Sequence, residues 1–345
     1  MRKKDSRRNA MVFASLFLYL LVGGLGAIIG FLGVLLGTAC YLVETLTRPQ
    51  KRSRFAHHVV SPFELGLPAE TVYFPPRAGR HLVSGWYVAA RGASATIIVC
   101  PGYRTRKSHT LAMVHVLWQA GYNVLAFEYY GHGAPVGARI TLGYRERDDF
   151  LGALDYARQR APNTELGVLA YSMGAAVAIM CSAHAPEVKA VVADSAFATH
   201  RSAVQYNVRR ALHLSGVAPQ VWLANSVVWL GDHLLGWLVG YRFHQVEPIR
   251  DIAQIAPRPL LLIHGGQDTM VDPHDAELLY AAAKSPKECW LVKEADHCGA
   301  YFEDRAAYIT RILAFFAASL KTSPKRPVLV PLPEPDIAEK PDDGL

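Results

Sequence analysis

The sequence has few of the features that mark disulfide-rich, metal-binding or nucleic-acid-binding proteins. Its five cysteines are an odd number, no two of them form a CxxC pair, and their spacing matches no common metal site. We find no internal repeat and no interleaving of aromatic and basic residues of the kind that marks an RNA-binding sheet. A disulfide framework, a metal centre and a nucleic-acid partner are therefore not expected, despite a net charge of +7.

Charge is also missing from Met11 to Val43, a run of 33 residues. About 20 residues cross the hydrocarbon core of a bilayer, whereas the apolar region of a secretory signal has only about 7–15. We therefore expect a basic flank at 1–10 and a retained transmembrane segment at 11–46, in a bacterial inner membrane. A twin-arginine signal and a lipoprotein signal ending at Cys40 are poorer matches to the same stretch.

The side of the membrane on which the rest of the chain lies stays open. Five basic residues precede the segment and four follow it, so the positive-inside rule only slightly favours an N-terminus inside and a domain outside. A hairpin within the membrane, with both flanks in the cytoplasm, is the alternative. Two GxxxG pairs fit either helix-mediated self-association or the ordinary glycine content of membrane helices. They are formed by Gly26 with Gly30 and by Gly33 with Gly37.

Beyond residue 55, short runs of apolar and β-branched residues alternate with helical patterns. A hairpin comes first, over 71–76 and 81–90, with Gly79 at its turn. The later runs are apolar throughout, as is typical of strands buried on both faces. The pattern predicts an α/β fold with a mostly parallel, eight-stranded sheet flanked by helices. Further strands are expected at 95–102, 123–130, 165–171, 188–195, 259–266 and 287–293, and helices at 108–120, 144–160, 173–185, 273–284 and 301–320.

One long interval between strands, residues 199–248, has no strand pattern. It carries Trp222, Trp229 and Trp237 among leucine and valine, and an aspartate and a histidine interrupt it, which excludes a membrane span. We expect a helical cap over the strand ends. The tryptophans either pack in the core of this cap or present a face that lines an acyl pocket or touches lipid.

The predicted domain covers residues 55–321 and includes the cap. Residues 322–345 contain six prolines and end in acidic residues. This composition predicts a disordered tail without catalytic groups.

A single serine stands between a predicted buried strand and a helix of small residues. In LGVLAYSMGAAVAIM (166–180), Ala170 and Gly174 flank Ser172 two residues away on either side, so the pattern is G-x-S-x-G with alanine first. Such a turn exposes the hydroxyl and directs the N–H of Met173 into the same space, where it stabilises an oxyanion. A nucleophile is predicted, and a serine that caps a buried helix is the alternative.

A serine nucleophile needs a base, and the base needs a carboxylate that fixes its tautomer. Of the 14 histidines, only His297 directly follows the last predicted strand, and Asp268 follows the strand before it. The order Ser172, Asp268, His297 is that of α/β-hydrolases. Asp194, at the end of another strand, and Asp272 remain as alternative acids.

A second oxyanion donor is expected in the loop CPGYRTRKS (100–108). Gly102 permits a turn there, and the backbone N–H of Tyr103 is the candidate donor. The HGG sequence at 264–266 resembles an oxyanion motif, but it follows the nucleophile and directly precedes the acid, so we exclude it from that role. The basic side chains of the loop either meet an anionic head group or phosphate, or are solvated; they are Arg104, Arg106 and Lys107.

Over about residues 62–320 the chain resembles the α/β-hydrolase superfamily, in its esterase, lipase and serine-aminopeptidase-like branch. FEYYGHG, YSMGAA and HGGQDTMVD are similar to successive motifs of that branch, although Glu128 and Tyr130 stand where Asp and Arg are usual. The resemblance implies the α/β-hydrolase fold and no cofactor or metal. It also implies a catalytic triad of Ser172, Asp268 and His297. The two backbone oxyanion donors that it implies are Tyr103 and Met173.

Together these features predict a membrane-anchored serine hydrolase that cleaves acyl esters through an acyl-enzyme. The apolar cap and the anchor favour lipidic or medium-chain esters, thioesters included. Peptide or amide cleavage by the same residues is the second hypothesis. A membrane-anchored scaffold without catalysis is the third.

Overall fold

A computed structural model describes residues 2–49, 60–132, 139–211 and 218–320. Its centre is one eight-stranded sheet in the order β1-β2-β4-β3-β5-β6-β7-β8. β2 runs antiparallel to both neighbours and the other pairs are parallel, as predicted. The strands are β1 (Ala69–Phe74), β2 (Val83–Val88), β3 (Ala95–Cys100), β4 (Asn123–Glu128), β5 (Glu165–Tyr171), β6 (Val188–Asp194), β7 (Leu260–Gly265) and β8 (Lys287–Val292).

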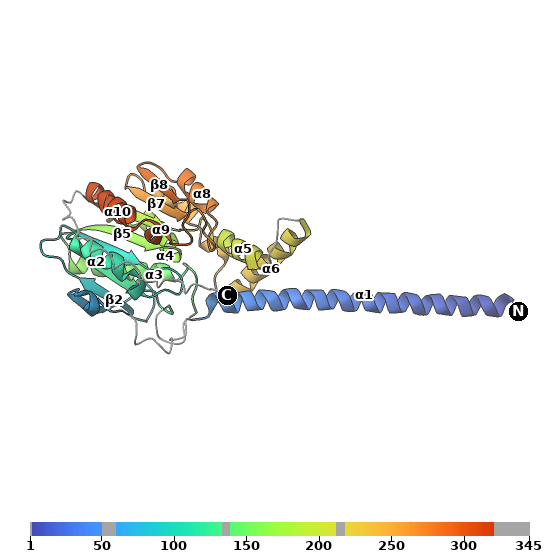
Figure 1. Ribbon diagram of the computed structural model, residues 1–345. Coiled ribbons are helices and arrows are strands. Elements are labelled where there is room, and N and C mark those ends of the chain that lie inside the picture. Colours follow the sequence, from blue (N-terminus) through green and yellow to red (C-terminus); the bar gives the residue numbers. More distant parts are fainter. Residues whose placement is uncertain (1, 50–59, 133–138, 212–217, 321–345) are drawn as a thin grey trace, which may run out of the picture.

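Helices cover both faces of this sheet (Figure 1). One face packs against α3 (Glu146–Arg160), α4 (Met173–Ala183) and α8 (His274–Ala282). The other packs against α2 (Leu111–Gln119) and α10 (Arg305–Ser319). Every residue of α4 is buried and small or apolar, so this helix packs closely against the sheet.

The interval 199–248, where a helical cap is predicted, is largely helical in the structure, and we call it the cap; residues 212–217 lie outside the description. Its main helices are α5 (His200–Ala211) and α6 (Ala218–Leu238). They enclose a small core of their own, to which the helix α1 (Arg2–Thr47) contributes Val43. The cap therefore packs on the N-terminal helix as well as on the sheet domain.

The tryptophans of α6 are exposed, so the interpretation that they pack in the core of the cap is wrong. Trp222, Trp229 and Trp237 are 59%, 55% and 82% exposed. Smaller side chains, such as those of Ala224 and Val228, fill the core from the opposite face of the helix. With 3.6 residues per turn, the tryptophans lie on one face and the core residues on the other.

The predicted transmembrane segment lies within α1, which is one uninterrupted helix. The alternative of a hairpin within the membrane is therefore wrong. The part from Phe17 to Thr47 is 31 residues long and reaches a mean hydropathy of 2.4 in a window that is not buried in the protein. Its length and composition suit a membrane span or a signal sequence. The predicted tail, 322–345, lies outside the described residues.

His200, at the start of the cap, makes the stability of the fold depend on pH. Its ring is fully buried, with ring centroids 4.6 Å from Phe243 and 5.8 Å from Tyr241. Neither ring nitrogen has a hydrogen-bond partner. Burial lowers the pKa of His200 to about 3, so the folded protein keeps this ring neutral.

We predict that His200→Phe removes part of the acid sensitivity. The unfolded chain binds a proton at His200 with a pKa near 6.5, whereas the folded chain does so only near 3, so stability is complete above 6.5 and falls as the pH drops. Between pH 7 and 5 the variant should lose about 2 kcal/mol less stability than wild type. Denaturant unfolding in detergent measures this difference, with the exposed His244→Phe as control. Equal losses of stability between pH 7 and 5 in wild type, His200→Phe and His244→Phe would contradict the prediction.

Candidate active site

Ser172 lies on the turn between β5 and α4. Its backbone has φ 52° and ψ −121°, a region that residues with a side chain rarely adopt. The N–H of Ser172 donates to the carbonyl of Asp194 at 2.7 Å, and its carbonyl accepts from the N–H of Ala176 at 3.1 Å. These two bonds hold the strained turn in place. Because both are made by the backbone of Ser172, its hydroxyl is free for other contacts.

Small neighbours let this turn close. A Cβ atom on Gly174 would lie 2.3 Å from the carbonyl oxygen of Pro101, so only glycine fits. Ala170, which stands where glycine is usual, is fully buried and pairs with Cys100 and Ala193 on the neighbouring strands. The alanine is therefore accommodated within the sheet.

Three predicted side chains from different loops meet at this edge of the sheet. His297 Nε2 lies 2.8 Å from Ser172 Oγ, and His297 Nδ1 lies 2.7 Å from Asp268 Oδ2. Both distances are those of hydrogen bonds. The structure thus connects carboxylate, imidazole and hydroxyl in one line, with Asp268 after β7 and His297 after β8.

The carboxylate of Asp268 is fully buried and is compensated on both oxygens. Oδ1 accepts the N–H groups of Met270 and Val271 at 2.8 Å. Oδ2 faces His297, and His264 Nε2 lies 3.2 Å away without the alignment of a full hydrogen bond. Burial alone would raise the pKa of Asp268, but both histidines and the backbone donors hold it well below its ordinary value. The group is therefore an anion at neutral pH.

The two alternative acids have other partners. Asp194 is buried and accepts a hydrogen bond from the hydroxyl of Tyr308 at 2.7 Å; burial raises its pKa in spite of that bond. Asp272 accepts the N–H of His274 at 3.0 Å, at the start of α8, as expected of a cap. In the described part of the chain, neither carboxylate has a hydrogen bond to the ring of His297.

The HGG sequence at 264–266 shapes the fold instead of forming an oxyanion site. A Cβ atom on Gly265 would lie 2.4 Å from the carbonyl oxygen of Ala295, and one on Gly266 would lie 2.5 Å from that of Lys293. The glycines therefore let the loop that carries His297 approach β7 closely. Sequence analysis missed His264 itself, whose signal was its place four residues before the predicted acid.

The loop after β3 passes directly beside the serine. A Cβ atom on Gly102 would lie 3.2 Å from the Cβ of Ser172. Tyr103 lines the same cavity as Ser172, and Met173 is the first residue of α4. Both residues are therefore close to the hydroxyl, while the action of their N–H groups as oxyanion donors remains a prediction.

The same loop is bonded to the end of α1. Arg104 Nη2 donates to the carbonyls of Thr45 at 2.6 Å and Arg48 at 2.9 Å, and the hydroxyl of Tyr103 donates to the carbonyl of Leu46 at 2.8 Å. The last carbonyls of a helix have no partner within it, and a positive charge is favourable there. The expectation of a solvated Arg104 is therefore wrong.

Lys107 is buried as well, so the expectation of a solvated side chain fails there too. Its Nζ lies 3.3 Å from a carboxylate oxygen of Glu128 and 3.1 Å from the hydroxyl of Ser84. It also lies 4.8 Å from the centre of the Trp86 ring. Glu128, which stands where aspartate is usual, thus pairs with a buried lysine.

An apolar cavity of about 460 Å³ opens beside Ser172 and His297. Its walls include Met113, Met270 and Phe302, and among the described residues that line it there is no aspartate or glutamate. The tryptophans of α6 are absent from this lining, so they do not form an acyl pocket here.

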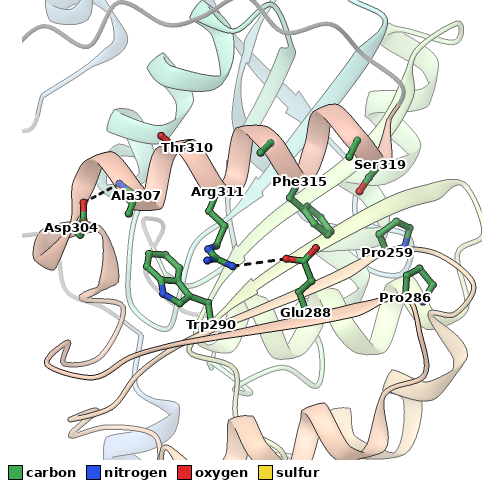
Figure 2. A pocket seen from close by; sticks show the side chains of 12 residues that line it. Pro259, Pro286, Glu288, Trp290, Asp304, Ala307, Thr310, Arg311, Phe315 and Ser319 are labelled. Carbon is green, nitrogen blue, oxygen red and sulfur yellow. Dashed lines mark hydrogen bonds and ion pairs between the residues drawn. The ribbon is translucent and has the colours of Figure 1, made fainter.

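A second, more open cavity of about 890 Å³ lies between β8 and α10 (Figure 2). There Arg311 faces Glu288 at 3.9 Å and lies over the ring of Trp290. None of the three aligned residues borders this cavity. Among the described residues, no three His, Cys, Asp or Glu side chains cluster as a metal ion would require.

Comparison with known proteins decides the family. The model of the family described as serine aminopeptidase, S33 (Hydrolase_4) matches residues 91–303. The chain belongs to this family of α/β-hydrolases. The uncharacterized protein YqkD of Bacillus subtilis (strain 168) is 26% identical over 262 residues, which cover 75% of this chain and 82% of YqkD. Human monoglyceride lipase is 24% identical over 246 residues, which cover 65% of this chain and 80% of the lipase.

A comparison with solved structures finds the same fold. The structure of the Pyrococcus furiosus esterase Pf2001 superposes on 79% of this chain and 99% of its own, with a TM-score of 0.62 at 22% identity. The α/β-hydrolase fold implied by the sequence motifs is thereby confirmed.

We predict that Arg104→Gln loosens the loop beside the serine. The variant loses two charged hydrogen bonds to the end of α1, which should lower the free energy of unfolding by about 1–3 kcal/mol. Hydrolytic activity should fall as well, because Gly102 and Tyr103 lose their fixed position. Denaturant unfolding and ester assays measure both effects. Arg91→Gln, at an exposed arginine, is the control, and equal behaviour of the two variants would contradict the prediction.

Proposed function

We propose that this member of the family is a membrane-anchored serine hydrolase that cleaves acyl esters. The observation that carries the proposal is the line of contacts from Asp268 through His297 to Ser172, beside an apolar cavity. The strained backbone of Ser172 supports it, since such strain concentrates at functional sites. The long apolar helix α1 serves as the anchor.

In the proposed reaction, Ser172 Oγ attacks the acyl carbonyl carbon while His297 Nε2 accepts the hydroxyl proton. The buried anion of Asp268 stabilises the imidazolium that results. The N–H groups of Tyr103 and Met173 stabilise the negative charge on the substrate oxygen. His297 returns the proton to the leaving alcohol, and a water molecule then hydrolyses the acyl-enzyme with the same imidazole as base.

The apolar walls of the cavity favour an acyl chain as the group bound there. The similarity to a protein named monoglyceride lipase points the same way, toward a lipidic ester. The family description instead suggests cleavage at a peptide N-terminus. That reaction needs a carboxylate to bind the free ammonium group, and the described lining provides none.

We predict that Ser172→Ala abolishes labelling of the membrane fraction by a fluorophosphonate probe. Asp268→Asn should lower kcat by about 10⁴-fold, because the neutral amide neither fixes the tautomer of His297 nor stabilises its cation. Asp272→Asn is the matched control and should keep nearly full activity. Absence of labelling in solubilised, folded wild-type protein would contradict the proposal and favour the scaffold hypothesis.

The same probe also decides the side of the membrane. A form that does not cross membranes should label intact cells, because the positive-inside rule favours a cytoplasmic N-terminus. Labelling only after lysis would assign the domain to the cytoplasm instead.

We further predict that kcat/KM rises with acyl length. Each methylene buried in the cavity contributes about 0.8 kcal/mol, so p-nitrophenyl esters should gain up to about fourfold per methylene until the cavity is full. Steady-state kinetics on esters from acetate to decanoate, with an aminoacyl anilide as comparison substrate, measure this. A profile without dependence on length, or faster cleavage of the anilide, would contradict an acyl-ester substrate.

A further inference from the structure

One face of α6 carries a stripe of mainly aromatic side chains, in which a histidine is the one titratable residue. Its members recur every three or four residues and therefore share one face. The aspartate of this helix, Asp232, is not part of the stripe, because it is buried and bonded to Arg242 at 2.8 Å. The stripe consists of Trp222, Ser226, Trp229, His233 and Trp237.

The beginning of α6 lies beside the middle of α1, and its end lies near the end of α1. The ring of Trp222 stacks on that of Phe31, with centroids 6.4 Å apart and planes 6° apart. Further along, a Cβ atom on Gly231 would lie 3.3 Å from the side chain of Leu42. The hairpin of α5 and α6 therefore projects from the sheet domain to the side on which the N-terminal part of α1 lies, at an angle to α1 (Figure 1).

The length of α1 fixes where a bilayer would begin. Its uncharged run starts at Met11, and residues 11–30 extend over about 30 Å, which equals the thickness of the hydrocarbon core. The remaining apolar residues, 31–43, are more than a span needs, and the described contacts with α6 involve this part of α1. With residues 11–30 as the span, the membrane surface falls at the level of Phe31 and Trp222.

We propose that the start of α6 lies in the interfacial layer of a phospholipid bilayer, with Trp222 at the boundary between headgroups and acyl chains. Tryptophan prefers this boundary because its ring is apolar and its N–H is polar. Trp237 follows 15 residues later, about 22 Å along the helix axis, and lies outside the bilayer. The proposal rests on the membrane anchoring by α1 proposed above.

Through α5, the hairpin of α5 and α6 also connects the bilayer with the loop that carries the proposed acid, Asp268. In α5, the hydroxyl of Tyr206 donates to the carbonyl of Asp268 at 2.8 Å, and the amide of Asn207 donates to the carbonyl of Met270 at 2.7 Å. Met270 lines the cavity beside the serine. Docking of the hairpin thus fixes the acid loop and the cavity relative to the lipid surface from which an amphiphilic ester would come.

Quenching of tryptophan fluorescence by lipid tests the proposal. The full-length protein is reconstituted into phosphatidylcholine vesicles with or without bromine on the acyl chains near the headgroups. α1 contains no tryptophan, so the signal comes from the rest of the chain. The quenched fraction should fall by about half in Trp222→Phe and stay unchanged in Trp237→Phe, while Trp229, about 10 Å further along than Trp222, retains weaker quenching.

Hydrolysis of a short, soluble ester in detergent should be equal in both variants and in wild type, which verifies that they fold. Absence of quenching in wild type, or equal losses in the two variants, would overturn the docking of α6. Extraction with alkaline carbonate separates this failure from that of the anchor. Release of the protein would refute the anchoring and the docking together, whereas a retained protein without quenching at Trp222 would refute the docking alone.

Discussion

A buried anion is the constraint on which the edge of the sheet beside Ser172 depends. The carboxylate of Asp268 has lost its hydration, so the protein must supply donors in place of water. Two come from the backbone of its own loop and one from His297 on the loop after β8, while the ring of His264 on β7 lies 3.2 Å from Oδ2. To satisfy Asp268, these loops have to close on each other, and that closure brings His297 to Ser172.

The other requirements of this edge follow from that closure. Loops that approach so closely leave no room for a side chain at Gly265 and Gly266, and the turn at Gly174 is equally tight. The strain at Ser172 is balanced by its bond to Asp194, whose own carboxyl is held by Tyr308 from α10. Residues from both layers of helices thus determine the position of one hydroxyl.

The sequence alone predicted the order of elements and the aligned residues, because buried parallel strands are continuous apolar runs and only one histidine directly follows the last of them. It failed where the answer depends on packing between distant segments. Arg104 and Lys107 looked solvated because their partners, the end of α1 and Glu128, are remote in sequence. The tryptophans of α6 looked like core residues because the helix is apolar on both faces, and packing against α1 and α5 decides which face is buried.

The hydrogen bonds between α1 and the loop of Tyr103 make the loop beside Ser172 dependent on the presence of α1. A version trimmed to the sheet domain would leave Arg104 and Tyr103 without their acceptors and uncover the cap core where Val43 packs. The helix α1 is thus a structural part of the hydrolase domain and not an independent segment attached to it. Exchange of α1 for an unrelated helix during evolution would demand compensating changes in the loop beside the serine, so the two segments are expected to be inherited together.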